Sequence, residues 1–135
     1  MEISHEPIRV LLADDHPAFM AGVESAMGAE PGLTVIGRAH SGVETLALTR
    51  ELAPTVLLLD MQLPDISGVE VARCLTESGA PTLILPLSGF TDPEYVMGVL
   101  EYGAAGYVTK DESMGTIMRA VRQVAAGGVY ISPRV

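Results

Sequence analysis

A fivefold alternation along the chain is the feature that most constrains its fold. Short runs rich in Leu and β-branched residues alternate with stretches in which apolar residues recur at every third or fourth position. Runs of the first kind are typical of buried strands, and stretches of the second kind are typical of helices packed on a sheet. The predicted strands are Ile8–Ala13, Leu33–Ala39, Thr55–Leu59, Thr82–Leu87 and Ala105–Val108, and the predicted helices are Pro17–Gly28, Val43–Leu52, Val69–Glu77, Pro93–Tyr102 and Ser113–Ala126.

Five strand-helix units in this order predict an α/β fold, a flavodoxin-like (βα)5 doubly wound parallel sheet with helices on both faces. Right-handed crossovers leave few topologies for such a sheet, and the common one has the strand order 2-1-3-4-5. A chain of 135 residues suffices for one domain but not for two of ordinary size. We expect residues 1–127 to form this domain, because the helical pattern stops at Gly127. Residues 128–135 would be a tail or the start of a linker.

Charge and composition exclude several other classes of protein. With 8 basic and 17 acidic side chains the net charge is −9, which repels nucleic acid and argues against direct DNA binding by this segment. No apolar run approaches the roughly 20 residues that a membrane-spanning helix needs. The first seven residues lack the basic start of a secretory signal, so we expect a cytoplasmic protein. Cys74 is the single cysteine, which rules out an internal disulfide bond.

Polar residues that can carry chemistry stand at the ends of four predicted strands. Asp14 and Asp15 follow the first strand and Asp60 the third. Ser88 follows the fourth strand, and Lys110 comes shortly after the fifth. Ligands of open parallel sheets bind beyond the carboxyl ends of the strands, near the point where the strand order reverses. These four strands are contiguous in the predicted order, so we expect the side chains to share one site.

Three aspartates gathered at one sheet edge repel one another unless a cation holds them together. Mg2+ fits this task, because it prefers hard oxygen ligands in an octahedron and keeps several waters. Taken alone, Asp14 or Asp15 could instead cap the helix that begins near Pro17. The expected magnesium ligands are Asp14, Asp15, Asp60 and the backbone carbonyl of Gln62.

A carboxylate in such a site can act as a nucleophile toward phosphorus and form an acyl phosphate. Lys110, the only lysine of the chain, could neutralise a phosphoryl oxygen opposite the metal. The Ser88 hydroxyl could donate a hydrogen bond to another oxygen. His16 adjoins the acidic pair, and we expect an exposed histidine at a helix start in preference to a metal ligand or phosphoryl donor.

Four segments, in order along the chain, resemble the receiver domain of bacterial two-component response regulators. They are RVLLADDHPAF around Asp14 and Asp15, VLLLDMQLPDISGVE around Asp60, LILPLSGF around Ser88 and GAAGYVTKDES around Lys110. Together they are highly specific, although each alone is weak, and the resemblance covers essentially the whole chain. The start DDHP and the end GGVYISPRV further resemble the NarL/FixJ (LuxR-type) subfamily, whose receivers usually precede a helix-turn-helix DNA-binding domain.

The resemblance implies a regulatory phosphoacceptor that is not an enzyme in the usual sense, since it takes part only in its own phosphorylation and dephosphorylation. It implies a sensor histidine kinase as partner and transcription as the output, through a DNA-binding domain outside this chain. A homodimer is compatible with the sequence. The implied roles are phosphoacceptor for Asp60, magnesium ligands for Asp14 and Asp15, phosphoryl sensor for Ser88, phosphoryl partner for Lys110 and aromatic switch for Tyr107.

Two other functions stay open at this point. A Mg2+-dependent phosphatase could use Asp60 as its nucleophile, but Gln62 stands where haloacid-dehalogenase-type enzymes have a second Asp. A pseudo-receiver would act by protein contact alone. Pro86 falls inside the predicted fourth strand, where a proline removes a ladder hydrogen bond, and is consistent with a local bulge that alters the aim of Ser88. Phe90 is expected to shade the site from water.

Overall fold

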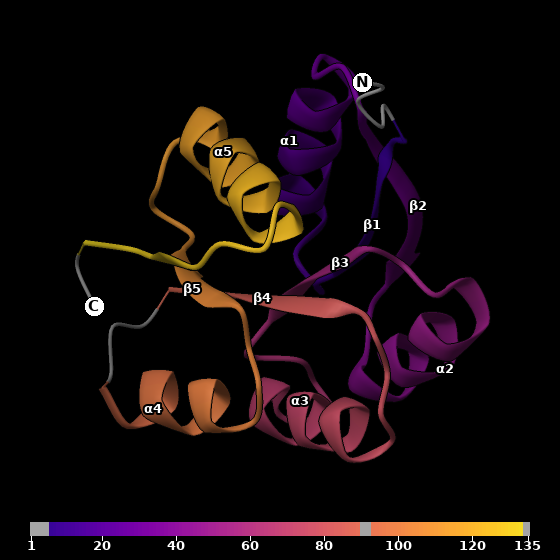
Figure 1. Cartoon of the computed structure of the whole chain (residues 1–135), viewed down its shortest axis with the longest axis vertical. Coiled ribbons are helices and arrows are strands. Elements are labelled where there is room, and N and C mark those ends of the chain that lie inside the picture. The colour runs from indigo at the N-terminus through magenta and orange to yellow at the C-terminus, as the bar shows by residue number, and fades with distance from the viewer. Residues whose placement is uncertain (1–5, 90–92, 134–135) are drawn as a thin grey trace.

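The chain folds into one twisted parallel sheet between two layers of helices (Figure 1). The computed structural model describes residues 6–89 and 93–133. Within these ranges the sheet has six strands in the order β2-β1-β3-β4-β5-β6. The predicted fold class and the order of the first five strands are confirmed. The strands are β1 Ile8–Ala13, β2 Leu33–Ala39, β3 Val56–Asp60, β4 Leu83–Ser88, β5 Gly106–Thr109 and β6 Tyr130–Ile131.

Five helices connect the strands, close to their predicted positions. Serine side chains define several of their starts. Ser41, Ser67 and Ser113 hold the N-cap positions of three helices, and each side chain accepts a hydrogen bond from the backbone N–H three residues later. Such a cap satisfies one of the N–H groups that a helix start leaves unpaired. The helices are α1 Pro17–Gly28, α2 Gly42–Leu52, α3 Gly68–Glu77, α4 Pro93–Glu101 and α5 Met114–Ala125.

Two separate apolar cores hold the helices to the sheet. Helices α1 and α5 cover one face, and α2, α3 and α4 cover the other (Figure 1). Successive strand residues point to opposite faces, so Val10 and Leu12 pack under α1 and α5. Their neighbours Leu11 and Ala13 pack toward the other helical layer. Because both faces are covered, the central strands are apolar at nearly every position, as parallel sheets require.

Three strands reach further toward their carboxyl ends than their apolar runs suggest. β3 includes Asp60, β4 includes Ser88 and β5 includes Thr109. Backbone pairing continues past Asp60, since the N–H of Met61 still donates to the carbonyl of Leu87 at 3.0 Å. The regular ladder therefore positions the polar residues at the strand ends.

Pro86 is tolerated because its nitrogen faces the less regular side of β4. Toward β3 the register runs unbroken from Val56 to Asp60. Toward β5, only Leu87 and Ser88 are paired. The N–H of Ala105 donates to the carbonyl of Ile84, and the N–H of Lys110 donates to the carbonyl of Ser88. Between these two hydrogen bonds the chain advances five residues along the β5 side, from 105 to 110, but only four along β4, from 84 to 88. This extra residue is the local irregularity consistent with the missing donor, and regular pairing resumes before Ser88.

Among the described residues, no helix combines the length and the apolar character needed to cross a bilayer.

Candidate functional site

The carboxyl ends of β1, β3, β4 and β5 bring the predicted site residues to one edge of the sheet. Asp14 directly follows β1 and is fully buried, and Asp60 ends β3 and is 2 % exposed. Ser88 ends β4 and is also buried. Lys110 follows β5, and its side chain is 18 % exposed. The backbone N–H of Lys110 donates to the Ser88 carbonyl at 2.9 Å, which ties the last two of these strand ends together.

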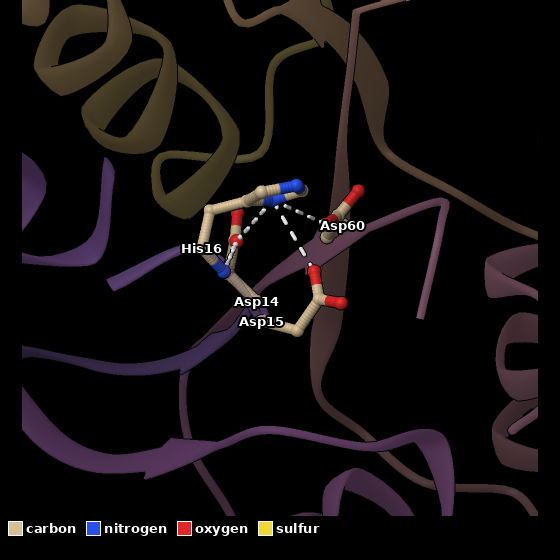
Figure 2. A group of neighbouring side chains, drawn as sticks. All are labelled: Asp14, Asp15, His16 and Asp60. Atoms are coloured by element: carbon tan, nitrogen blue, oxygen red, sulfur yellow. Dashed lines mark hydrogen bonds and ion pairs between the residues drawn. The ribbon is translucent and has the colours of Figure 1, made fainter. Parts of the chain in front are cut away.

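Three carboxylates converge in this site, as Figure 2 shows. Ligand atoms of Asp14, Asp15 and Asp60 lie within 4.8 Å of one another, together with an imidazole nitrogen of His16. Asp15 is the most open of the three, with its side chain 35 % exposed. Two buried carboxylates beside a third on the surface form a strongly negative site. The arrangement matches the predicted cluster of acidic oxygens.

Lys110 supplies the positive charge of the site. Its ammonium nitrogen lies 2.7 Å from Asp14 Oδ2 and 3.3 Å from Asp60 Oδ2. The same nitrogen lies 4.7 Å from the centroid of the Phe19 ring, an attractive cation–π distance. Sequence reasoning missed Phe19, since an aromatic residue in an amphipathic helix is usually read as core. Lys110 therefore links the ends of β1 and β3 through its ion pairs with Asp14 and Asp60.

One oxygen of the cluster is suited to a metal ion. Asp14 Oδ2 is buried and has no directed hydrogen bond among the described residues. Its short contact with the Lys110 ammonium has the distance of an ion pair without the angles of a hydrogen bond. A buried carboxylate oxygen without a directed hydrogen bond, close to two further carboxylates, belongs to the hard donor set that Mg2+ prefers. The residues present therefore fit a magnesium ion.

His16 lies closer to the chemistry than its exposure suggests. Its side chain is 59 % exposed, as predicted for a histidine at a helix start. Its Nδ1 atom nevertheless lies 3.0 Å from Asp14 Oδ1, 3.2 Å from Asp15 Oδ1 and 3.5 Å from Asp60 Oδ2 (Figure 2). Its backbone N–H also donates to Asp14 Oδ1 at 2.7 Å. Adjacency to the acidic pair was the only sequence signal for this placement.

Tight packing under the β3–α3 loop holds Asp60 in place. The N–H of Gln62 donates to Asp60 Oδ1 at 3.0 Å, which turns the chain directly after the strand. Gly68 starts α3 so close to Met61 that a Cβ atom there would lie 2.7 Å from the Met61 Cα atom. Only glycine permits this approach, so the first turn of α3 buttresses the residue next to Asp60.

Asp65 fastens the far end of the same loop. Its two carboxylate oxygens accept the backbone N–H groups of Gly42 at 2.6 Å and Val43 at 3.0 Å. These groups belong to the first turn of α2 and have no partner within the helix. The loop that follows Asp60 is thus anchored to a second helix. Sequence reasoning did not identify this contact, because it joins residues 22 and 23 positions apart.

We expect the Asp65→Asn variant to be less stable than the wild type at neutral pH and equally stable in acid. Hydrogen bonds from the N–H groups of Val43 and Gly42 lower the pKa of Asp65. A carboxylate of this kind stabilises the fold above its unfolded pKa of about 4, and the contribution is lost as pH falls through the lower folded pKa. The free energy of unfolding in urea, measured for both proteins at several pH values, tests this. A difference that does not change with pH would contradict it.

The two residues expected to respond to the phosphoryl group are both buried. Ser88 lies at the end of β4, and Tyr107 packs in the core beneath α3 and α4. Tyr107 shares this core with Leu59 of β3. Asp60 follows Leu59 in the strand, so by alternation it points to the opposite face of the sheet from Leu59 and Tyr107. Phe90, which was expected to shade the site, lies outside the described residues.

Comparison with known proteins yields one family. The profile of the response regulator receiver domain matches residues 10–122. Response regulator GacA of Pseudomonas protegens is 38 % identical over 128 residues, which are 95 % of this chain and 60 % of GacA. Transcriptional regulatory protein DegU of Brevibacillus brevis is 34 % identical over 134 residues, which are 99 % of this chain and 57 % of DegU. The chain thus spans about 60 % of the length of such relatives.

Solved structures give the same result. The signal receiver domain of NarL from Mycobacterium tuberculosis superimposes with a TM-score of 0.87 at 36 % identity, covering 90 % of this chain and 98 % of that domain. A LuxR-family two-component response regulator from Aurantimonas superimposes with a TM-score of 0.89 at 29 % identity, covering 95 % of this chain and 91 % of that one. The resemblance to NarL/FixJ-type regulators is confirmed.

Proposed function

Because this chain belongs to the response regulator receiver domain family, we propose that it is the phosphorylation switch of a two-component system. Asp60 is the proposed acceptor of the phosphoryl group. A sensor histidine kinase, or a small donor such as acetyl phosphate, is the proposed source. The chain would act as a regulated acceptor and not as an enzyme that turns over an external substrate.

The observation that carries this proposal is a nearly buried carboxylate paired with an ammonium group. Asp60 Oδ2 lies 3.3 Å from the Lys110 nitrogen at the open end of the sheet. Hydrogen bonding fixes the other oxygen, because Asp60 Oδ1 accepts from Gln62 N–H. A held carboxylate beside a fixed cation is suited to phosphoryl transfer, where catalysis consists mainly of positioning and charge neutralisation.

In the proposed reaction, a carboxylate oxygen of Asp60 attacks phosphorus in line with the bond to the leaving group. The new O–P bond forms an acyl phosphate, and the leaving group departs with the electron pair of the bond that breaks. From a phosphohistidine the leaving group is an imidazole, and from acetyl phosphate it is acetate. Lys110 neutralises a phosphoryl oxygen, and the Ser88 hydroxyl donates a hydrogen bond to another.

Asp14, Asp15, Asp60 and the backbone carbonyl of Gln62 are the proposed ligands of a magnesium ion. When bound, Mg2+ would offset the negative charge that the carboxylates and the phosphoryl group share. The buried Asp14 Oδ2 atom, with no directed hydrogen bond among the described residues, supports this assignment.

The proposed output follows from the strand ends that hold the phosphoryl group. New contacts to Ser88 and Lys110 would favour a second packing of β4 and β5, with Tyr107 as the aromatic switch and the surface of α4, β5 and α5 as the part that changes. We place the protein in the cytoplasm and propose transcription as the regulated process. Residues 1–127 would be the receiver, and residues 128–135, which include the short strand β6, would be a tail or the start of a linker to a DNA-binding domain. We also propose that the protein can form a homodimer.

The test is incubation of the protein with acetyl phosphate, with Mg2+ or with a chelator, followed by intact mass. We expect one phosphoryl group per chain with Mg2+ and none with the chelator, because the charge of the acidic cluster repels the donor dianion. Reduction of the product with borohydride and peptide mapping then identifies the modified residue. No mass gain, or a gain that does not depend on Mg2+, would contradict the proposal.

A further inference from the structure

A short sixth strand lies against β5, beyond residue 122 where the match to the family profile ends. In Figure 1 it belongs to the yellow segment that follows α5 and passes beside β5, at the edge of the sheet. Gly106 pairs with Tyr130 and Tyr107 pairs with Ile131. β5 is the strand that leads into Lys110, so this segment contacts the backbone on which the phosphoryl site is built.

Ser132 makes the most specific of these contacts. It is 1 % exposed, although it lies near the end of the described chain. Its backbone N–H donates to the Tyr107 carbonyl at 2.9 Å, and its Oγ atom accepts the N–H of Thr109 at 2.9 Å. Thr109 is the residue before Lys110. Ser132 therefore binds the backbone at the end of β5 at two points, Tyr107 and Thr109, which flank Val108.

A second contact fastens the same segment. The Tyr130 hydroxyl donates to Glu112 Oε2 at 2.6 Å, and this hydrogen bond raises the pKa of Tyr130. Glu112 is itself tied to β5, because its backbone N–H donates to the Thr109 carbonyl at 3.1 Å. The loop that carries Lys110 thus lies between two hydrogen bonds to the final segment.

Gly106 provides the space for this close approach. A Cβ atom at Gly106 would lie 2.2 Å from the Tyr130 carbonyl oxygen and 3.0 Å from the Tyr130 nitrogen. Both are backbone atoms, so any larger residue would push the strand away from β5. An alanine at this position is therefore a means of displacing β6 without changing its sequence.

We propose that Ser132 is a positioning residue for the phosphoryl site, acting through the Thr109 backbone on Lys110. The proposal rests on the phosphorylation of Asp60 described above. The Lys110 ammonium contacts Asp60, and the residue before Lys110 is Thr109, whose backbone N–H donates to Ser132 Oγ. Binding equilibria that share such an element are linked reciprocally, so a phosphoryl group held by Lys110 must also favour the docked position of β6.

The test compares Ser132→Thr with Ser132→Val. These side chains have nearly the same shape, and only threonine keeps the oxygen that accepts the Thr109 N–H. The probe is beryllofluoride, a mimic of the phosphoryl group, titrated in the presence of Mg2+ and followed by fluorine NMR. We expect the valine variant to bind beryllofluoride about fivefold more weakly than the threonine variant, the factor that one ordinary hydrogen bond supplies. Equal affinities would overturn the proposal.

Amide hydrogen exchange provides a second, reciprocal measurement. In the wild type, saturation with beryllofluoride is expected to slow exchange at the Thr109 and Ser132 amides, and the Asp60→Asn variant is expected to show no such change. Gly106→Ala acts from the opposite strand and should weaken beryllofluoride binding as the valine variant does. Exchange rates in the wild type that do not respond to the bound mimic would overturn the linkage.

The two proposals fail in different ways. A wild-type protein that neither gains a phosphoryl group nor binds beryllofluoride would overturn the proposed function, and the role of Ser132 with it. A wild type that does both, while the threonine and valine variants behave alike, would overturn only the role of Ser132. Thermal unfolding of each variant, without ligand, confirms that the compared proteins are folded.

Discussion

The Asp60→Asn variant is expected to gain no phosphoryl group from acetyl phosphate at any Mg2+ concentration. An amide oxygen carries no full negative charge, and attack through it would not give a stable acyl phosphate. Asparagine has the shape of aspartate and can still accept the N–H of Gln62, so the end of β3 should keep its conformation. Intact mass after incubation with acetyl phosphate measures the result directly.

Asp65→Asn is the matched control for this experiment. Asp65 lies in the same β3–α3 loop, and its carboxylate accepts the N–H groups of Gly42 and Val43 instead of facing the acidic cluster. We expect this variant to be phosphorylated like the wild type at neutral pH. Phosphorylation of the Asp60→Asn variant to the wild-type level would mean that another carboxylate, such as Asp14 or Asp15, is the acceptor.

The Lys110→Ala variant is expected to be phosphorylated roughly a hundredfold more slowly, the loss seen when one fixed charge-stabilising donor is removed from an active site. The ammonium group lies 3.3 Å from Asp60 Oδ2, where it can meet the charge that develops on the phosphoryl oxygens. No other lysine is present in the chain to replace it. The measurement is the initial rate of mass gain with saturating Mg2+ and varied acetyl phosphate.

Lys110→Arg separates charge from shape in the same assay. Arginine keeps the positive charge but replaces a compact ammonium with a broad planar fork, so we expect a rate between those of the wild type and the alanine variant. Unfolding in urea, with and without Mg2+, shows whether the alanine variant is folded, because Lys110 also neutralises the buried Asp14. An alanine variant as fast as the wild type would exclude Lys110 from the reaction.

The fold could be predicted because its main determinant is local and repeated. Buried parallel strands such as Val56–Asp60 must be apolar on both faces, and this requirement leaves a visible run in the sequence. Three strands were predicted to end one residue too early. Asp60, Ser88 and Thr109 belong to their strands through backbone pairing, which the polarity of a side chain does not reveal. β6 was not predicted, because a strand of two residues, Tyr130–Ile131, has no periodicity to detect.

The candidate site could be predicted to the extent that strand ends define it. Asp14, Asp60, Ser88 and Lys110 each stand at a position that the topology brings to one edge. Contacts that depend on side-chain torsions or distant loops left no signal. The His16 ring turns toward three carboxylates, and Ser132 reaches Thr109 across 23 positions of sequence. Such contacts follow from tertiary packing, which single-residue patterns do not encode.

The sixth strand also has a consequence for solubility. Without it, β5 would be the outermost strand, and its unpaired N–H and C=O groups could template association with another chain. Pairing with Tyr130 and Ile131, together with the two hydrogen bonds that Ser132 makes to the β5 backbone through its N–H and its Oγ atom, pairs groups of that row within the molecule. The new edge is only two residues long and is followed closely by Pro133, which has no N–H to offer. The final segment thereby disfavours edge-to-edge association at the β5 side of the sheet.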